Sequence, residues 1–143
     1  MVPAVCIFCD IVAGELTAVK VFEDDETLAF LDVRPVFPGH TLLVPKDHVE
    51  TLGDLPDAVL PRFFSNARML SRAVPRAMEA EGTFVAMNNV VSQSVPHLHV
   101  HVVPRRRKDG LRGFFWPRNP YESGEQVEAV AAALRAAVAA ESA

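Results

Sequence analysis

The sequence has little charge and no long apolar run. Only 22% of its 143 residues are charged, half are hydrophobic, and the formal net charge is -4 at pH 7. A chain of this size and composition can bury a proper core, so we expect a globular protein and not a disordered one. The acidic balance argues against a general binder of nucleic acid or membranes. No apolar stretch reaches the roughly 18 residues of a membrane span.

Cysteine is scarce as well. Cys6 and Cys9, in CIFCD, are the only two. By spacing alone they are a redox dithiol, two core cysteines or half of a zinc site, and a redox pair would be expected near a βαβ pattern that the sequence lacks. The N-terminus does not have the basic and then apolar layout of a signal peptide. We therefore expect a cytoplasmic protein with reduced thiols.

Strand-like segments come in runs, with helical segments segregated among them. Short stretches rich in Val, Phe and Leu predict strands at 18–24, 27–33, 40–49, 83–89 and 96–104. Residues 56–82 carry apolar side chains at helical spacing and predict a long helix that Gly82 should stop. Its predicted inner face consists of Leu60, Phe63, Phe64, Ala67, Leu70, Val74, Ala77 and Met78.

An alanine-rich segment at 125–143 predicts a C-terminal helix. Together these elements predict an α+β fold in a single domain over residues 1–143. It would contain a mainly antiparallel sheet of about five strands, one long central helix and a C-terminal helix.

Three of the five histidines occupy alternate positions in VPHLHVHVV. Residues two apart in a strand point to the same face, so His97, His99 and His101 should line one side while Leu98 and Val100 serve the core. Such imidazoles can bind a metal, act as a nucleophile with orienting partners, or form an inert exposed face. The basic residues that follow are either a solvated loop or a collar that attracts a small anion. They are Arg105, Arg106, Arg107, Lys108 and Arg112.

Three blocks, in order along the chain, resemble the histidine triad family of nucleotide hydrolases and transferases. They are CIFCDIVAGE, FEDDETLAFLDVRPVFPGHTLLVPKDHV and NNVVSQSVPHLHVHVVPR, the last containing the pattern His-x-His-x-His-x-x with apolar x. The resemblance covers about residues 5–105 and leaves a more variable region at 106–143. It implies a HIT-like fold, a homodimer and hydrolysis at the α-phosphate of nucleoside phosphoramidates or (di)nucleoside polyphosphates.

The resemblance also implies a division of labour among the histidines. His99 corresponds to the family nucleophile, which forms a nucleotidyl-histidine intermediate, while His101 contacts the phosphate and His40 lies beside the triad. One zinc ion per chain would be held by Cys6, Cys9, His48 and His97. Four protein ligands leave no open position for water, so that Zn²⁺ should be structural.

A purine nucleotide pocket is implied as well. Asp32 would accept hydrogen bonds from the ribose, and the base would lie between Phe8, Ile11, Phe30, Leu31 and Val33. Asn88, Gln93 and Ser94 would contact the phosphate, although Ser92 stands where many members have glycine. The aromatic residues Phe114, Phe115 and Trp116 would cover the substrate or dock the last helix.

Two other functions fit the same residues. One is a zinc hydrolase whose triad binds catalytic metal, although residues two apart on a strand are about 6.6 Å apart and converge poorly on one ion. The other is a nucleotide-binding module without turnover.

Overall fold

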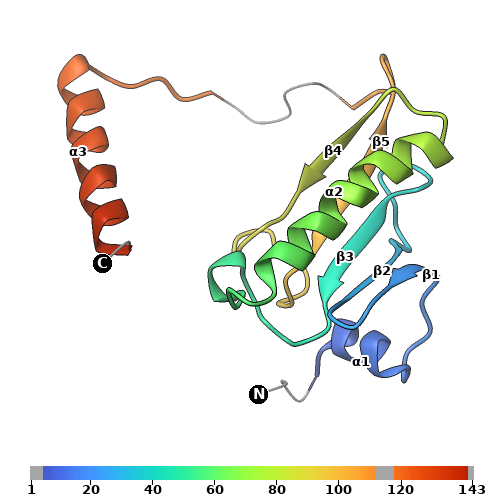
Figure 1. Ribbon diagram of the computed structural model, residues 1–143. Coiled ribbons are helices and arrows are strands. Elements are labelled where there is room, and N and C mark those ends of the chain that lie inside the picture. The colour runs from blue at the N-terminus through green and yellow to red at the C-terminus, as the bar shows by residue number, and fades with distance from the viewer. Residues whose placement is uncertain (1–4, 112–117, 142–143) are drawn as a thin grey trace. The chain divides into compact units, whose positions relative to one another are not determined.

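The computed structural model describes residues 5–111 and 118–141. The chain divides into two units, Met1–Asp109 and Gly110–Ala143. The first contains a five-stranded sheet in the order β1-β2-β3-β5-β4, with every neighbouring pair antiparallel (Figure 1). The strands are β1 (Lys20–Glu23), β2 (Thr27–Leu31), β3 (Thr41–Pro45), β4 (Gly82–Ala86) and β5 (Val100–Arg105). The predicted α+β fold with an antiparallel sheet of five strands is confirmed.

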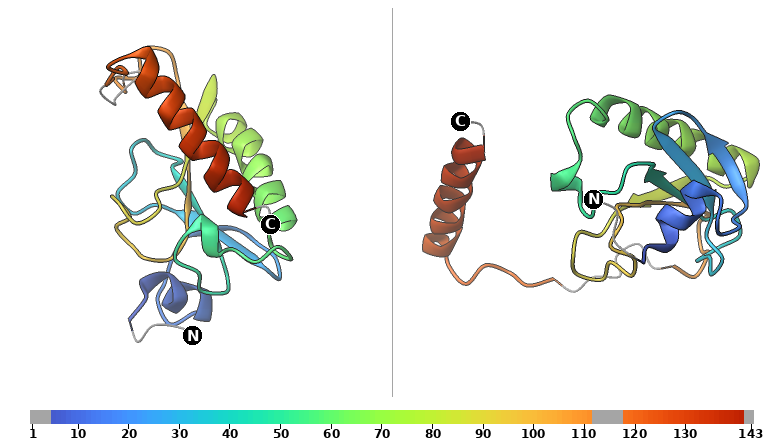
Figure 2. Two further views of the ribbon diagram at one scale, coloured as in Figure 1. Left: turned by 90° about the vertical axis from the view of Figure 1, so that its left-hand side faces the viewer. Right: turned by 90° about the horizontal axis from the view of Figure 1, so that it is seen from below.

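Helices cover both faces of this sheet. The long helix α2 (Leu60–Ala77) runs along one face, and the short helix α1 (Ile7–Ala13) lies beyond the other (Figure 2). A 3-10 turn, η1 (Leu52–Asp54), precedes α2. Side chains alternate along the strands accordingly. Ala29 and Leu43 join the core beneath α2, whereas Leu28 and Leu42 join the core beneath α1.

The long helix α2 differs from the prediction at its inner face and at its end. Phe64 is 42% exposed and Ala77 is exposed too, whereas Asn66, which was not predicted, is buried. The helix ends at Ala77 and not at Gly82, which instead begins β4. Pro75 lies inside the last turn. The chain leaves the helix at Glu79, which has a φ of 52°, and the Ala80 N–H donates back to Pro75 O at 2.8 Å.

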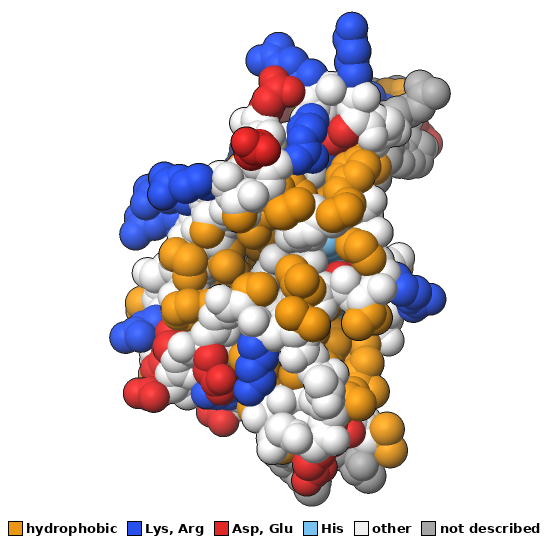
Figure 3. Space-filling view, turned by 90° about the vertical axis from the view of Figure 1, so that its right-hand side faces the viewer, with side chains coloured by type: hydrophobic (Ala, Val, Ile, Leu, Met, Phe, Trp, Pro, Cys, Tyr) orange, Lys and Arg blue, Asp and Glu red, His pale blue; other side chains and the backbone are white. Residues whose placement is uncertain are grey.

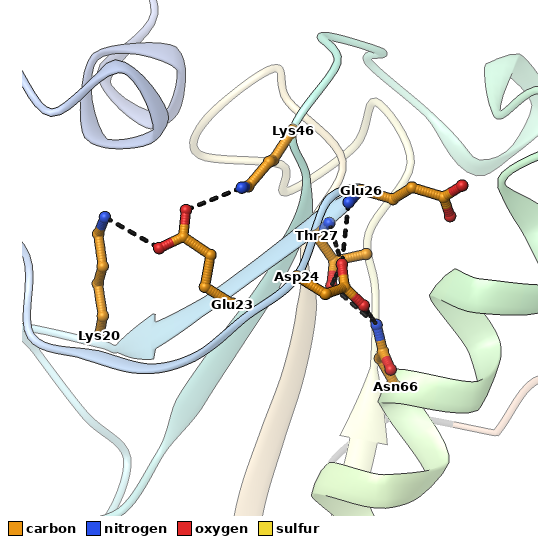
Figure 4. Close-up of polar contacts among 7 residues, drawn as sticks. All are labelled: Lys20, Glu23, Asp24, Glu26, Thr27, Lys46 and Asn66. Atoms are coloured by element: carbon orange, nitrogen blue, oxygen red, sulfur yellow. Dashed lines mark hydrogen bonds and ion pairs between the residues drawn. The ribbon is translucent and has the colours of Figure 1, made fainter.

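Asn66 is buried because it binds the turn between β1 and β2 (Figure 4). Its Nδ2 donates to Asp24 Oδ2 and to Thr27 Oγ1, both at 2.8 Å. Asp24 Oδ1 also accepts the backbone N–H groups of Glu26 and Thr27 at 2.9 and 2.8 Å. Nearby, Glu23 pairs with Lys46 at 2.8 Å and Lys20 at 3.3 Å. The turn that starts the sheet is therefore held to α2 by polar contacts.

The second unit contains α3 (Gly124–Glu141), the predicted C-terminal helix. None of the described residues of α3 is buried, and Leu134 and Val138 are 60% and 63% exposed. Phe114, Phe115 and Trp116 lie outside the described residues. Within the described ranges, no helix has both the length and the apolarity needed to cross a membrane.

Candidate functional site

Of the three triad histidines, His97 and His99 come just before β5 and His101 lies within it, on the side of the sheet that faces α1. Leu98, Val100 and Val102 point into the core beneath α2, and His97 and His99 are buried on the other side. The alternation matches the sequence pattern, but the strand itself begins only at Val100. The reason is that the Leu98 N–H donates to Val49 O at 2.8 Å, outside the ladder with β3.

Four predicted metal ligands come together from three distant segments. Ligand atoms of Cys6, Cys9, His48 and His97 all lie within 4.8 Å of one another. Cys9 Sγ is 3.3 Å from His48 Nδ1, and Cys6 Sγ is 3.5 Å from His97 Nδ1. The cysteines belong to the start of α1, where the Cys9 N–H donates to Cys6 Sγ and caps the helix.

The chemistry of this donor set fits zinc. His97 Nε2 lies 2.8 Å from the carbonyl oxygen of Pro45, which can only accept, so Nε2 carries the proton and Nδ1 is free to bind a metal. Burial and the neighbouring Cys6 raise the pKa of the Cys9 thiol to about 11. Ionisation of both thiols at neutral pH therefore requires a cation that compensates their charge. Two sulfurs and two imidazole nitrogens are the ligands of a closed tetrahedral zinc site.

His99 is held in one tautomer by its own strand. Its Nδ1 is 2.7 Å from His97 O, so Nδ1 carries the proton and Nε2 keeps a free lone pair. Phe8 packs edge-on against the His99 ring, with the ring centroids 5.1 Å apart. This fixed ring with an unprotonated Nε2 is the arrangement that a nucleophilic imidazole requires.

A second relay sets the tautomers of His40 and His101. The Val36 N–H donates to His40 Nδ1 at 3.1 Å, so the proton of neutral His40 is on Nε2. That Nε2 lies 3.0 Å from His101 Nδ1 and donates to it, which leaves the proton of neutral His101 on Nε2. His101 can therefore present an N–H donor to an oxyanion.

Burial keeps both of these rings neutral. Burial, followed by the neighbouring His99 and His40, lowers the pKa of His101 to about 4. Burial also lowers the pKa of His40, although Asp32 opposes this shift. Asp32 Oδ2 lies 3.7 Å from His40 Nε2.

Asp32, His40 and His101 form the second cluster of possible metal ligands among the described residues. This cluster fits a metal poorly, since the proton that the Val36 contact places on His40 Nε2 blocks the nitrogen that would bind. The two clusters thus differ in chemistry. The cluster of Cys6, Cys9, His48 and His97 suits a cation, whereas the cluster around His40 and His101 suits hydrogen-bond donation.

A cavity of about 610 Å³ opens beside His99 and His101. Seven of the predicted nucleotide residues line it: Phe8, Ile11, Phe30, Leu31, Asp32, Val33 and Ser94. Phe8, Ile11 and Phe30 also belong to the core beneath α1, whereas Val33 is 91% exposed. The cavity is large enough for a nucleotide-sized ligand.

Several wall residues were not predicted from the sequence. Leu16, Thr17 and Ala18 come from the loop between α1 and β1, and the wall also includes Ile7, Arg34, Leu42 and Val95. A short loop has no periodic pattern that would identify it as a wall, so the sequence carries no signal for residues 16–18.

Two predicted phosphate contacts lie outside this lining. Gln93 binds its own loop, donating from Nε2 to Glu50 O at 2.5 Å and accepting from the Val90 N–H at 3.0 Å. Asn88 Nδ2 donates to Ser92 O at 3.2 Å. Ser92, where many family members have glycine, has a φ of 61°. The roles of Asn88 and Gln93 at the phosphate stay predictions.

The basic run after the triad is engaged in local ion pairs. Arg105 binds Asp109 at 2.6 Å, and Arg107 binds Glu81 at 2.9 Å. None of the described basic residues of this run lines the cavity. The contacts therefore favour a structural role over an anion collar.

A second hollow of about 320 Å³ lies between β1 and α2, and Figure 3 shows hydrophobic side chains gathered on this side of the molecule. Val21, Phe22, Met69, Ala73 and Met78 contribute to its wall. Among the described residues that line it, none is titratable. It lacks the groups that hydrolysis needs.

Comparison with known proteins places these residues in a family context. The family model described as "HIT domain" matches residues 13–108. The chain is 39% identical over 113 residues to the protein named Hit of Bacillus subtilis, covering 78% of each. It is 35% identical to an adenylylsulfatase of Arabidopsis thaliana, covering 74% of this chain and 55% of that protein. It is 37% identical to an adenosine 5′-monophosphoramidase of Saccharomyces cerevisiae, covering 76% and 68%.

Solved structures agree with the fold. A protein from Streptococcus mutans superposes with a TM-score of 0.85 at 32% identity, covering 96% of this chain and 87% of that one. A zinc-bound histidine triad family protein from Mycobacterium smegmatis superposes with a TM-score of 0.70 at 37% identity, covering 92% and 96%.

Proposed function

The chain belongs to the HIT family, and from that premise we propose that it hydrolyses nucleotides at the α-phosphate through a covalent intermediate on His99. The observation that carries the proposal is the His99 ring, which lines the cavity and whose Nδ1 lies 2.7 Å from His97 O, so that Nε2 keeps its lone pair. Substrates would be nucleoside phosphoramidates, (di)nucleoside polyphosphates or related adenylates. These all share the α-phosphate that His99 would attack.

The reaction proceeds in two balanced steps. The Nε2 lone pair of His99 forms a bond to the α-phosphorus as the bond from phosphorus to the leaving group breaks, and the leaving group departs with the bonding electrons and takes up a proton as its basicity requires. Water then forms a bond to the same phosphorus and loses a proton to solvent, the P–N bond breaks, and His99 regains its lone pair as the nucleoside monophosphate leaves. A neutral imidazole suits both steps, because it is nucleophilic and leaves readily from phosphorus.

The neighbouring residues position the phosphate and the nucleoside. His101 Nε2–H donates to a phosphate oxygen, and His40 fixes that tautomer through its 3.0 Å contact with His101 Nδ1. Asp32 accepts hydrogen bonds from the ribose, while Phe8 and Phe30 form the base slot with Ile11, Leu31 and Val33. Ser94 contacts the phosphate from the cavity wall. Such an apolar slot grips a purine by burial and discriminates weakly between bases.

One structural zinc ion per chain would be held by Cys6, Cys9, His48 and His97. When bound, the ion supplies a crosslink and no reactive water, because all four positions are protein ligands. His97 then fixes the backbone carbonyl that orients His99. The zinc-bound relative from Mycobacterium smegmatis supports this assignment.

Mass spectrometry of a reaction quenched in base tests the proposal. We expect a nucleotidyl adduct on His99 after incubation with adenosine 5′-phosphoramidate or diadenosine tetraphosphate, and no adduct or turnover in His99→Ala. Turnover that chelators abolish, with no adduct, would instead establish the metal-dependent hydrolase. Tight binding of AMP with neither adduct nor turnover would establish a binding module.

A further inference from the structure

We propose that Arg34 selects substrates whose leaving group is an oxyanion, such as a sulfate or a phosphate. The inference rests on the proposed function and specifies its substrate class. Two of the relatives are named for substrates of the two classes, an adenylylsulfatase and an adenosine 5′-monophosphoramidase. A cavity that prefers one of these classes has to respond to the charge of the leaving group.

Among the described residues that line the cavity, Arg34 is the only lysine or arginine. The other charged group of the wall is Asp32, whose carboxylate repels anions. His101 and His40 contribute no positive charge at neutral pH, because burial lowers the pKa of each. Among the described residues of this wall, Arg34 is therefore the positively charged side chain that can bind a second anionic group of the substrate, beyond its α-phosphate.

Arg34 is held close to the phosphate-binding side of the cavity by a chain of contacts. Its backbone N–H donates to Asp32 Oδ1 at 2.9 Å. The other carboxylate oxygen of Asp32 is 3.7 Å from His40 Nε2, which is 3.0 Å from His101 Nδ1. Between the backbone of Arg34 and His101, the residue proposed to bind the phosphate, lie only the carboxylate of Asp32 and the ring of His40.

The guanidinium group of Arg34 is available to bind a ligand. Arg34 is exposed, and across residues 5–111 and 118–141 its side chain has neither an ion pair nor a hydrogen bond. The arginines of the basic run contrast with it, because Arg105 and Arg107 are engaged with Asp109 and Glu81. A planar guanidinium with free donors suits two oxygens of a tetrahedral oxyanion.

Arg34→Ala isolates the guanidinium, because alanine keeps the backbone N–H that orients Asp32. We would measure kcat/KM for adenylyl sulfate, diadenosine tetraphosphate and adenosine 5′-phosphoramidate. The variant should lose about 10-fold on the two substrates with anionic leaving groups and little on the phosphoramidate, as expected for one charge-assisted contact near the surface. The sulfate and phosphate substrates separate the two kinds of oxyanion, and Arg34→Lys should restore part of the loss.

Arg72 provides a matched control, since it is an exposed arginine on α2 that does not line the cavity. Arg72→Ala should leave the ratio between substrates unchanged. Equal losses on all three substrates, or none, in Arg34→Ala would overturn the inference while the phosphoramidate turnover still supports the proposed function. A selective loss of inhibition by adenosine 3′,5′-bisphosphate, with unchanged ratios between substrates, would place Arg34 at the ribose and also overturn it.

Discussion

At the scale of single residues, Asp24 stabilises the turn between β1 and β2 through several hydrogen bonds. Burial alone would raise the pKa of Asp24, but hydrogen bonds from Asn66, Glu26 and Thr27 outweigh it and hold the pKa well below its ordinary value of 3.8. A group whose pKa is lowered on folding stabilises the protein above its unfolded pKa. The stabilisation is lost as the pH falls below about 3.8 toward the pKa of the folded state.

Asp24→Asn should therefore lower the free energy of unfolding at pH 7 by about 2 kcal/mol, because several charge-assisted hydrogen bonds are weakened. Urea denaturation between pH 7 and pH 3 measures the difference from wild type, which should shrink as the pH falls below about 3.8. Asp25→Asn is the matched control, since Asp25 is the exposed neighbour in the same turn. A difference that grows toward acid pH would contradict the assignment.

Also at this scale, the site depends on which ring nitrogen carries each proton. His97, His99 and His40 each have one ring nitrogen fixed by a backbone group, namely Pro45 O, His97 O and the Val36 N–H. His97 is thereby suited to metal binding, His99 to nucleophilic attack and His40 to hydrogen-bond donation. The backbone partner of each ring makes this distinction, and the spacing of histidines in the sequence does not encode it.

At the scale of elements, the turn before β3 places His40. Gly39 has a φ of 96°, in the left-handed region that favours glycine, and an added Cβ would lie 2.5 Å from Met78 Cγ. Gly39→Ala should lower the free energy of unfolding by about 2 kcal/mol, combining backbone strain with displacement of the Met78 side chain. Gly53→Ala is a suitable control, because its Cβ would meet nothing nearer than 3.7 Å. Chemical denaturation that finds the two variants equally stable would contradict this account.

Sequence periodicity was sufficient to predict the sheet, the two long helices and the alternation of His97, His99 and His101. It was wrong about Phe64, which is exposed, and it missed the burial of Asn66, which depends on hydrogen bonds to the distant turn at Asp24 and Thr27. It also could not find Arg34, whose place in the wall depends on the hydrogen bond from its backbone to Asp32. The periodicity of apolar residues predicts which side chains face the core. Contacts between segments that are distant in the sequence decide which residues form a site.

At the scale of the whole first unit, the predicted zinc joins α1, the segment after β3 and the segment before β5. We expect purified protein to contain about one zinc per chain by elemental analysis. His48→Ala should lose that zinc and lower Tm by at least about 5 °C, because metal binding contributes directly to folding. Glu50→Ala, an exposed change two residues away, should retain both the metal and the Tm. Fully folded, metal-free wild-type protein would contradict the zinc site.

The predicted homodimer requires a surface on which two copies can meet, and β4 offers one. β4 is an edge strand, with Val85 43% exposed on it and Phe64 42% exposed on the neighbouring α2. If two copies pair along β4, their sheets continue into one another and these side chains become buried. Val85→Lys should then give a monomer, because a lysine on an edge strand opposes pairing. Light scattering should report a mass near 15.6 kDa for the variant and twice that for wild type.

Val21→Lys tests the opposite edge of the same sheet. Val21 is 49% exposed on β1, so the substitution is matched in residue type and exposure. If the dimer forms along β4, Val21→Lys should remain a dimer at the concentration that dissociates Val85→Lys. If only Val21→Lys dissociates the dimer, the interface lies instead at β1 and α2, where the apolar hollow of about 320 Å³ is found. Because the described lining of the cavity beside His99 comes from one chain, from Ile7 to His101, the monomeric variant should still form the proposed adduct on His99.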